Sequence, residues 1–333
     1  PFLNARGQDV IIGFIDTGID YLRDNFKDSS GNTRILAIWD QTVEYEASSL
    51  VSYGRVYEAA AINTAIRAYE AGEDPYSHVK SQDTNGHGTF MAGIAASSYT
   101  DGYIGVAPEA DIVCVKLKGA KRYLRDYFYI KDDVPAFQES DIMLAATFLK
   151  DYAQRRNKPL ENGGTGSEAA VPIAADVFDA YTKLTNTCVV VPAGNEAVSR
   201  THFSGYAGIA ADSKTMEINV DKRGKGFVIE IWAKSLDVLS VSIVSPTGEI
   251  IPRIPARIGM SSEYAFLLEN SRIYVDYQIT ESVAGQEIIF MRFESPAEGV
   301  WKVLVYSLTN LPGYFNAWIT PRFLSASDAY FLE

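Results

Sequence analysis

Three polar residues stand at the ends of apolar segments, in the order aspartate, histidine and asparagine, and this limits the folds open to the chain. Asp16 follows the apolar run 10–15, His87 opens a run of small and apolar residues, and Asn195 follows the apolar run 188–192. Short, nearly all-apolar runs are typical of strands buried on both faces of a parallel sheet, which collects its functional groups at the carboxyl ends of its strands. The sequence therefore predicts that Asp16 and His87 meet at one edge of such a sheet.

Each of the three residues suits one task in hydrolysis by a nucleophile. The Asp16 carboxylate can accept a hydrogen bond from an imidazole and stabilise the imidazolium that forms during catalysis. An unperturbed imidazole titrates near pH ~6.5, so a histidine is the side chain that suits a general base, and His87 can take this role. The side-chain amide of Asn195 can donate to a developing oxyanion. Taken singly, these motifs also fit turns, and it is their order that favours a catalytic interpretation.

In this order the Asp-Thr-Gly, His-Gly-Thr and Ala-Gly-Asn motifs resemble those of the subtilisin-like serine proteases, the subtilase superfamily, where aspartate precedes histidine and serine. More narrowly, the chain is similar to the Csp-type proteases of bacterial spore germination. That similarity lies in segments 34–42, 62–66, 115–118 and 138–143 and in the long β-rich region that follows. It spans nearly the whole chain.

The resemblance implies a role for each site residue. Asp16 would orient His87, His87 would shuttle the proton, and Asn195 would polarise the carbonyl of the scissile bond. A glycine-rich stretch before the asparagine matches the family's substrate-binding loop. The glycines concerned are Gly163, Gly164 and Gly166.

The serine nucleophile is absent from the expected place, because no Gly-Thr-Ser-x-Ala segment follows Asn195. Ser167 stands in a similar glycine-rich setting, but it precedes the asparagine and aligns with the substrate loop. We therefore expect the serine outside this chain, and we expect residues 1–333 alone to be inactive. The resemblance implies a protein or peptide substrate, such as a protein precursor, and as partners the enzyme's own prodomain and the missing C-terminal part.

The pattern along the chain predicts two domains. Strands and helices alternate over 1–210, which predicts an α/β catalytic domain with a doubly wound, mostly parallel, incomplete subtilisin-like sheet. Residues 211–325 read as many short strands with Gly and Pro turns, which predicts an inserted β-sandwich or jelly roll. Residues 326–333 are expected to return toward the catalytic domain.

Two local features complete the expected fold. The segment 158–167 has almost no apolar run, so the strand that should precede the substrate loop is expected to be missing, or residues are absent there. Cys114 and Cys188 both lie in apolar, strand-like runs, and we expect both to be inert thiols of the core.

Composition excludes some functions. The net charge is −12, from 30 Lys and Arg against 42 Asp and Glu, which argues against a nucleic-acid partner. No apolar run reaches the ~18 residues that a membrane-spanning helix needs. No cofactor is expected, and a structural calcium is left open. The location is unknown; the Csp resemblance implies a secreted or spore-associated protein.

Two alternative functions remain. The first is a subtilase scaffold that has lost catalysis and acts in binding or signalling. Such a scaffold would be free to lose Asp16 and His87, so the presence of both residues favours the active protease. An aspartic protease also uses Asp-Thr-Gly, but it needs a second such aspartate to share a proton, and the chain contains one Asp-Thr-Gly.

Overall fold

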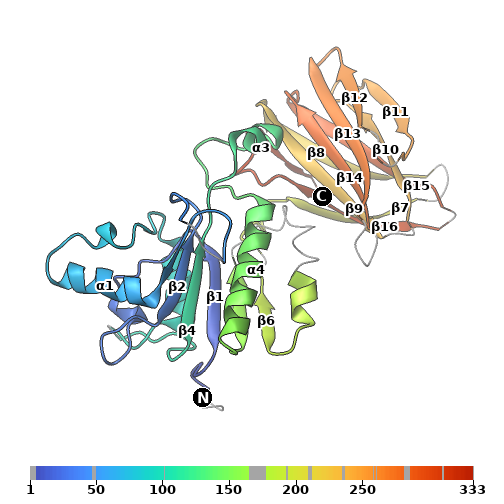
Figure 1. Ribbon diagram of the computed structural model, residues 1–333. Coiled ribbons are helices and arrows are strands. Elements are labelled where there is room, and N and C mark those ends of the chain that lie inside the picture. The colour runs from blue at the N-terminus through green and yellow to red at the C-terminus, as the bar shows by residue number, and fades with distance from the viewer. Residues whose placement is uncertain are drawn as a thin grey trace. The chain divides into compact units, whose positions relative to one another are not determined.

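The chain folds into two compact units that interleave along the sequence. In the computed structural model, unit 1 contains residues 1–119 and 137–193, and unit 2 contains residues 120–136 and 194–333 (Figure 1). The structure describes residues 5–46, 50–100, 102–164, 178–192, 194–208, 212–234, 237–257, 259, 261–280, 286–309 and 311–332.

Unit 1 is built on one six-stranded sheet with the strand order β3-β2-β4-β1-β5-β6. The pairs are parallel except that β3 runs antiparallel to β2. This is the mostly parallel sheet that the alternating pattern predicts. Its strands are β1 (Ile11–Asp16), β2 (Ile35–Asp40), β3 (Arg55–Glu58), β4 (Asp111–Lys116), β5 (Leu160–Gly164) and β6 (Thr187–Val190).

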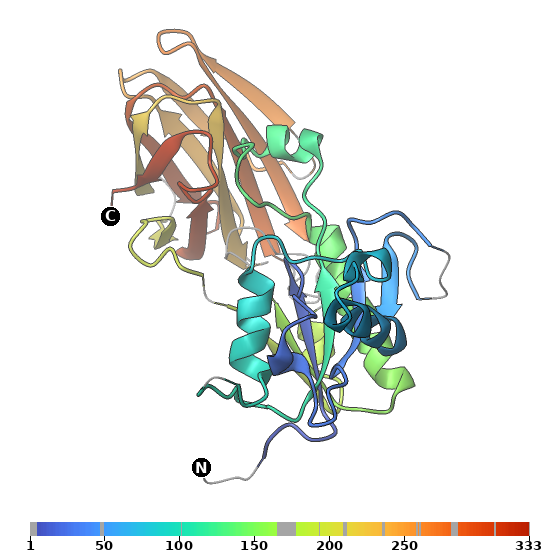
Figure 2. The same ribbon diagram turned by 90° about the vertical axis from the view of Figure 1, so that its left-hand side faces the viewer.

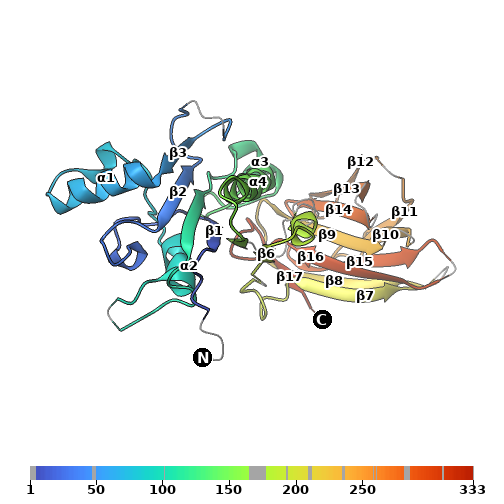
Figure 3. The same cartoon turned by 60° about the horizontal axis from the view of Figure 1, so that its bottom comes forward.

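Helices cover both faces of this sheet at β1, which explains why Ile11–Ile15 is almost entirely apolar. Ile12 and Phe14 of β1 join a core with helices α1 (Ala59–Glu70) and α2 (His87–Ala96). Ile11 and Ile15 point the other way, into a core with α4 (Glu139–Arg155). Figure 3 shows α2 and α4 on opposite sides of β1. Two short 3₁₀ turns, Asp24–Phe26 and Pro75–Ser77, lie in the connections.

The segment Leu160–Gly164 forms strand β5, where the sequence predicts that the strand is missing. It pairs in parallel with β1 on one side and with β6 on the other. Pairing with two neighbours supplies the backbone hydrogen bonds, so context overrides the poor strand propensity of Glu, Asn and Gly. The prediction of a missing strand is therefore wrong.

The two cysteines differ, although the sequence predicts that both lie in the core. Cys114 in β4 is buried, and burial raises the pKa of its thiol well above the ordinary value, as expected of an inert core thiol. Cys188 is exposed, and Val190 is 50% exposed. Cys188 and Val190 lie on the same face of β6, so within the described residues this face is exposed, and β6 is also the edge strand of the sheet.

Unit 2 consists mainly of two antiparallel sheets that share one large apolar core (Figure 2). The strand orders are β11-β10-β15-β8-β17 and β12-β13-β14-β9-β16-β7. The strands are β7 (His202–Ala207), β8 (Lys214–Lys222), β9 (Gly226–Lys234), β10 (Leu239–Val244), β11 (Ile250–Ile254), β12 (Ser261–Phe266), β13 (Ser271–Thr280), β14 (Gln286–Glu294), β15 (Gly299–Ser307), β16 (Gly313–Ile319) and β17 (Asp328–Phe331).

The segment 120–136, which contains α3 (Arg122–Tyr127), packs on the second of these sheets. The ring of Tyr127 stacks 6.0 Å from that of Phe290 in β14. Arg292 of the same strand lies over the Tyr127 ring at 4.0 Å and donates from Nε to the Tyr127 carbonyl oxygen at 3.0 Å. This segment lies between β4 and α4 in the sequence, yet its aromatic side chains fix it to unit 2.

The observed units therefore differ from the predicted domain boundaries at three places. Residues 120–136 belong to unit 2 rather than to a continuous 1–210 domain. Strand β7 also belongs to unit 2, because it pairs with β16. Residues 328–331, expected to return toward the catalytic domain, form β17 and pair with β8.

Glu287 of β14 makes the stability of unit 2 depend on pH. Burial raises the pKa of this carboxyl to about 7; the Leu239 N–H, which donates to Oε2 at 2.7 Å, opposes the rise, and Asp237 adds to it. The folded state holds this proton more tightly than the unfolded state. The stabilisation is therefore complete below pH 4.5, the ordinary value, and is lost as the pH rises to about 7.

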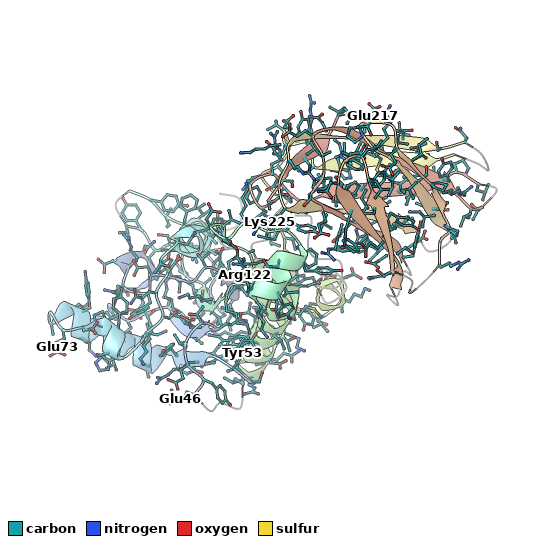
Figure 4. The ribbon with its side chains drawn as sticks, turned by 90° about the horizontal axis from the view of Figure 1, so that it is seen from above. Glu46, Tyr53, Glu73, Arg122, Glu217 and Lys225 are labelled. Atoms are coloured by element: carbon teal, nitrogen blue, oxygen red, sulfur yellow. The ribbon has the colours of Figure 1, made fainter. Side chains whose placement is uncertain are left out.

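We expect the Glu287→Gln variant to lose this component, which amounts to about 3 kcal/mol in the free energy of unfolding. Urea unfolding at a series of pH values between the two pKa values measures it. The control is Glu217→Gln on β8 (Figure 4), whose carboxylate pairs with Lys302 at 2.8 Å on the surface; it should keep the parent's pH dependence. Parallel curves for the parent and Glu287→Gln would contradict the assignment.

Candidate active site

Asp16 and His87 form a hydrogen-bonded pair at the carboxyl edge of the sheet in unit 1. Asp16 is the last residue of β1, and His87 is the first residue of α2. The Nδ1 atom of His87 lies 3.0 Å from both carboxylate oxygens of Asp16. The structure thus brings together the two residues that the sequence placed at this edge, and α2 lies beside β1 (Figure 2).

The two members of the pair have different exposures, and this suits different tasks. Asp16 is 2% exposed, while the side chain of His87 is 48% exposed. Burial raises the pKa of Asp16, and hydrogen bonds from the Thr17 N–H, at 2.6 Å, and from His87 oppose the rise. The buried carboxylate can fix the imidazole through Nδ1. The other ring nitrogen, Nε2, is then the atom that would exchange a proton with a reacting group.

Side chains of other residues, rather than the N-cap residue itself, bind the first turn of α2 and connect it to the loop that follows Asp16. Gly86 occupies the N-cap position with a left-handed φ of 87° and has no side chain to cap with. The N–H groups of the helix start are nevertheless all accepted. The Gly86 N–H donates to Asp83 Oδ1 (2.9 Å), and the Thr89 N–H donates to Asp83 Oδ2 (2.9 Å). The His87 N–H donates to Asn85 Oδ1 (3.3 Å), and the Gly88 N–H donates to Thr17 Oγ1 (3.0 Å).

Gly88 allows this helix start to approach the aspartate loop. A Cβ atom at position 88 would lie 2.1 Å from the Gly18 carbonyl oxygen and 3.0 Å from the Asp16 Cβ. Gly18 itself has a φ of 124°, which disfavours any side chain. The glycines of both motifs are therefore needed for the contact that places His87 over Asp16.

The predicted substrate glycines fall beside this pair as far as the structure describes them. Gly163 and Gly164 end β5 and pair with Phe14 and Ile15 of β1, next to Asp16. Their backbone thus lies on the strand adjacent to the aspartate. Gly166 lies outside the described residues, as does Ser167.

Asn195 belongs to unit 2, so its part in the site stays a prediction from the sequence. It follows β6 in an exposed turn. Its backbone N–H donates to Glu196 Oε2 at 2.8 Å.

A second polar cluster fixes the neighbouring strand ends. Lys118, just beyond β4, places Nζ 3.6 Å from the ring centre of Tyr53 (Figure 4) and 3.0 Å from Asp141 Oδ1. The Tyr53 hydroxyl donates to the same Asp141 oxygen at 2.7 Å. The cluster joins the start of α4 to the sheet edge.

Within the described part of the chain, no group of three or more His, Cys, Asp or Glu side chains is arranged to hold a metal ion.

Asp83 is a further residue of this site, and none of the sequence motifs above includes it. Its carboxylate accepts from Thr17 Oγ1 at 2.9 Å and from Thr89 Oγ1 at 2.6 Å, besides the two backbone N–H groups of the helix start. The polar run Asp-Thr-Asn-Gly before an apolar helix is a helix-start signal that could have found it. The His-Gly-Thr motif begins at His87 and so does not include Asp83.

Comparison with known proteins places these features in context. The model of the subtilase family matches residues 7–252. The structure of the Clostridium perfringens CspB protease is similar to this chain with a TM-score of 0.77 and 28% identity; the alignment covers 99% of this chain and 65% of that chain. This chain thus spans less than two thirds of the length of that structure.

The other comparisons add little. An S41 psychrophilic protease matches with a TM-score of 0.35 and 20% identity over 59% of this chain and 49% of that chain, which supports no argument. No curated protein matches. Among the described residues, no helix is long and apolar enough to cross a membrane.

Proposed function

Because the chain belongs to the subtilase family, we propose that it supplies the aspartate and histidine of a serine endopeptidase that acts on protein or peptide substrates. The observation that supports this most directly is the contact between His87 Nδ1 and both oxygens of Asp16. A half-exposed imidazole held by a buried carboxylate is the arrangement that a general base needs.

The proposed mechanism uses protein groups alone. His87 Nε2 takes the proton of a serine hydroxyl as that oxygen attacks the scissile carbonyl, and Asp16 stabilises the imidazolium that results. His87 then gives the proton to the leaving amine as the peptide bond breaks, and it acts as base again when a water molecule attacks the serine ester that remains, which releases the acid and restores the serine hydroxyl. Asn195 donates to the oxyanion, and the backbone of Gly163 and Gly164 binds the substrate. The serine is supplied by a segment outside residues 1–333.

The outer side of α2 supports the idea that a further segment completes this site. The helix is apolar on nearly all sides, and such helices are normally buried. Yet Phe90 is 65% exposed and Ile94 is 40% exposed, and both line a hollow with Tyr103. We propose that the segment that brings the serine covers this side of α2. The prodomain of the whole protein is the other partner of the proposed enzyme.

Labelling with a fluorophosphonate tests the proposed function. We expect the whole protein to react covalently through its serine, and the His87→Ala variant of the whole protein to react far more slowly. Residues 1–333 alone should stay unlabelled, because the nucleophile is not among them. Mass spectrometry of the intact protein measures both.

Two results would contradict the proposal. Labelling of residues 1–333 would place the nucleophile inside this chain, and Ser167 would be the first residue to replace. A folded whole protein that stays unlabelled would favour the alternative, a subtilase scaffold that acts by binding.

A further inference from the structure

The carboxylate of Asp83 sits between the two catalytic motifs and bonds to both. Oδ1 accepts from the Thr17 hydroxyl at 2.9 Å and from the Gly86 N–H at 2.9 Å. Oδ2 accepts from the N–H of Thr89 at 2.9 Å and from its hydroxyl at 2.6 Å. One side chain thus joins the residue after Asp16 to the residues on either side of His87.

The hydroxyl of Thr17 has its direction fixed by this carboxylate. It donates to Asp83 and, through the same oxygen, accepts the Gly88 N–H at 3.0 Å. The Thr17 N–H in turn donates to Asp16 Oδ1 at 2.6 Å. Thr17 therefore links the two carboxylates, because its hydroxyl bonds to Asp83 and its backbone N–H bonds to Asp16.

The charge state of Asp83 favours this arrangement. Burial raises the pKa of the carboxyl, but the hydrogen bonds from Thr89, Gly86 and Thr17 outweigh burial and lower it. An ionised carboxylate accepts all four bonds, and it also complements the positive end of the α2 dipole. The Lys116 side chain, at the end of β4, approaches Gly18 together with Asp83, because a Cβ at Gly18 would lie 3.3 Å from both Asp83 Cβ and Lys116 Cδ.

We propose that Asp83 is the positioning residue of this site, which caps α2 from outside the helix and so holds His87 Nδ1 on Asp16. The same hydrogen bonds of Asp83 then cap the helix and align His87 with Asp16. The inference rests on the proposed function for its catalytic meaning. The hydrogen bond that it concerns can be measured without activity.

The test is the low-field proton resonance of His87 Nδ1–H in residues 1–333. The chain has three histidines, and the signal is assigned by its loss in His87→Ala. An asparagine at position 83 can accept through one atom only, and its amide group opposes donors on the other. We expect Asp83→Asn to lose or broaden the resonance. Asp74→Asn is the matched control, because Asp74 caps the short turn Pro75–Ser77 by accepting from the Tyr76 N–H, and it should leave the resonance unchanged.

A second pair of variants decides the matter if Asp83→Asn fails to fold. Thr89→Val removes the hydroxyl that bonds to Asp83 but keeps the charge of the carboxylate. Thr89→Ser keeps the hydroxyl. We expect the resonance to weaken in the valine variant and to persist in the serine variant.

In the whole protein, Asp83→Asn should slow fluorophosphonate labelling about 10²-fold through misplacement of His87. An unchanged His87 resonance in Asp83→Asn, or an equal loss in Asp74→Asn, would overturn the role of Asp83. An unmodified whole protein that is not labelled would instead overturn the proposed function, and the resonance would still decide the role of Asp83.

Discussion

Replacing Asp16 by asparagine in the whole protein is expected to lower kcat about 10⁴-fold, by analogy with the same change in other serine-protease triads. The asparagine amide has nearly the size of the carboxylate, and its oxygen can still accept the Thr17 N–H. Its NH₂ group, however, cannot accept the Nδ1–H of His87, so the imidazole loses the tautomer that a base at Nε2 requires. The rate of peptide hydrolysis at saturating substrate measures the effect.

The control for this change is Asp24→Asn. Asp24 lies in the 3₁₀ turn Asp24–Phe26 and pairs with Lys27 at 2.8 Å on the surface. It should leave kcat unchanged. An Asp16→Asn enzyme with kcat within tenfold of the parent would show that Asp16 is not the orienting carboxylate.

Replacing Gly88 by alanine should cost about 3 kcal/mol or more in the free energy of unfolding of unit 1. The new methyl group would lie 2.1 Å from the Gly18 carbonyl oxygen. That atom is backbone, in the loop that directly follows Asp16, so relief requires α2 to move away from β1. The His87 to Asp16 hydrogen bond should be lost together with the stability. Urea unfolding and the His87 Nδ1–H resonance measure the two effects.

Gly93 provides the control within the same helix. A Cβ at this position meets only the Asn25 side-chain nitrogen, at 3.7 Å. Gly93→Ala should therefore fold as well as the parent, and it can gain up to about 1 kcal/mol from helix propensity. If the two alanine variants were equally stable, the close approach at Gly88 would not be the constraint described above.

The strands of unit 1 were predictable where both faces are buried. The run Ile11–Ile15 is apolar because helices cover the sheet on both sides, and this leaves a clear sign in the sequence. Strand β5 leaves no such sign, since after Leu160 its sequence has no apolar residue and its place is seen in its backbone pairing with β1 and β6. Cys188 was misjudged because an apolar run does not reveal whether its strand lies in the middle of a sheet or at an edge.

The contact between Asp16 and His87 was predictable for a similar reason, whereas the hydrogen bonds of Asp83 that surround it were not. Asp16 and His87 belong to short motifs at the ends of regular elements. Asp83 acts through Thr17, which is distant in the sequence, and through Thr89, and only the folded chain brings these residues together. The aromatic segment around Tyr127 shows the same limit, because its partner Phe290 is far along the chain.

The interleaving of the two units bears on how the protein is made. The chain passes between them after residues 119, 136 and 193. On the ribosome, Tyr127 emerges long before Phe290 and Arg292, the β14 residues that it packs against. The segment 120–136 therefore cannot make these contacts while α4 and the rest of unit 1 are synthesised, although domains commonly fold in the order of their synthesis. The sheet of unit 1 can therefore form before its inserted segment 120–136 has a partner, and unit 2 is complete only after strands β14 to β17 have been synthesised.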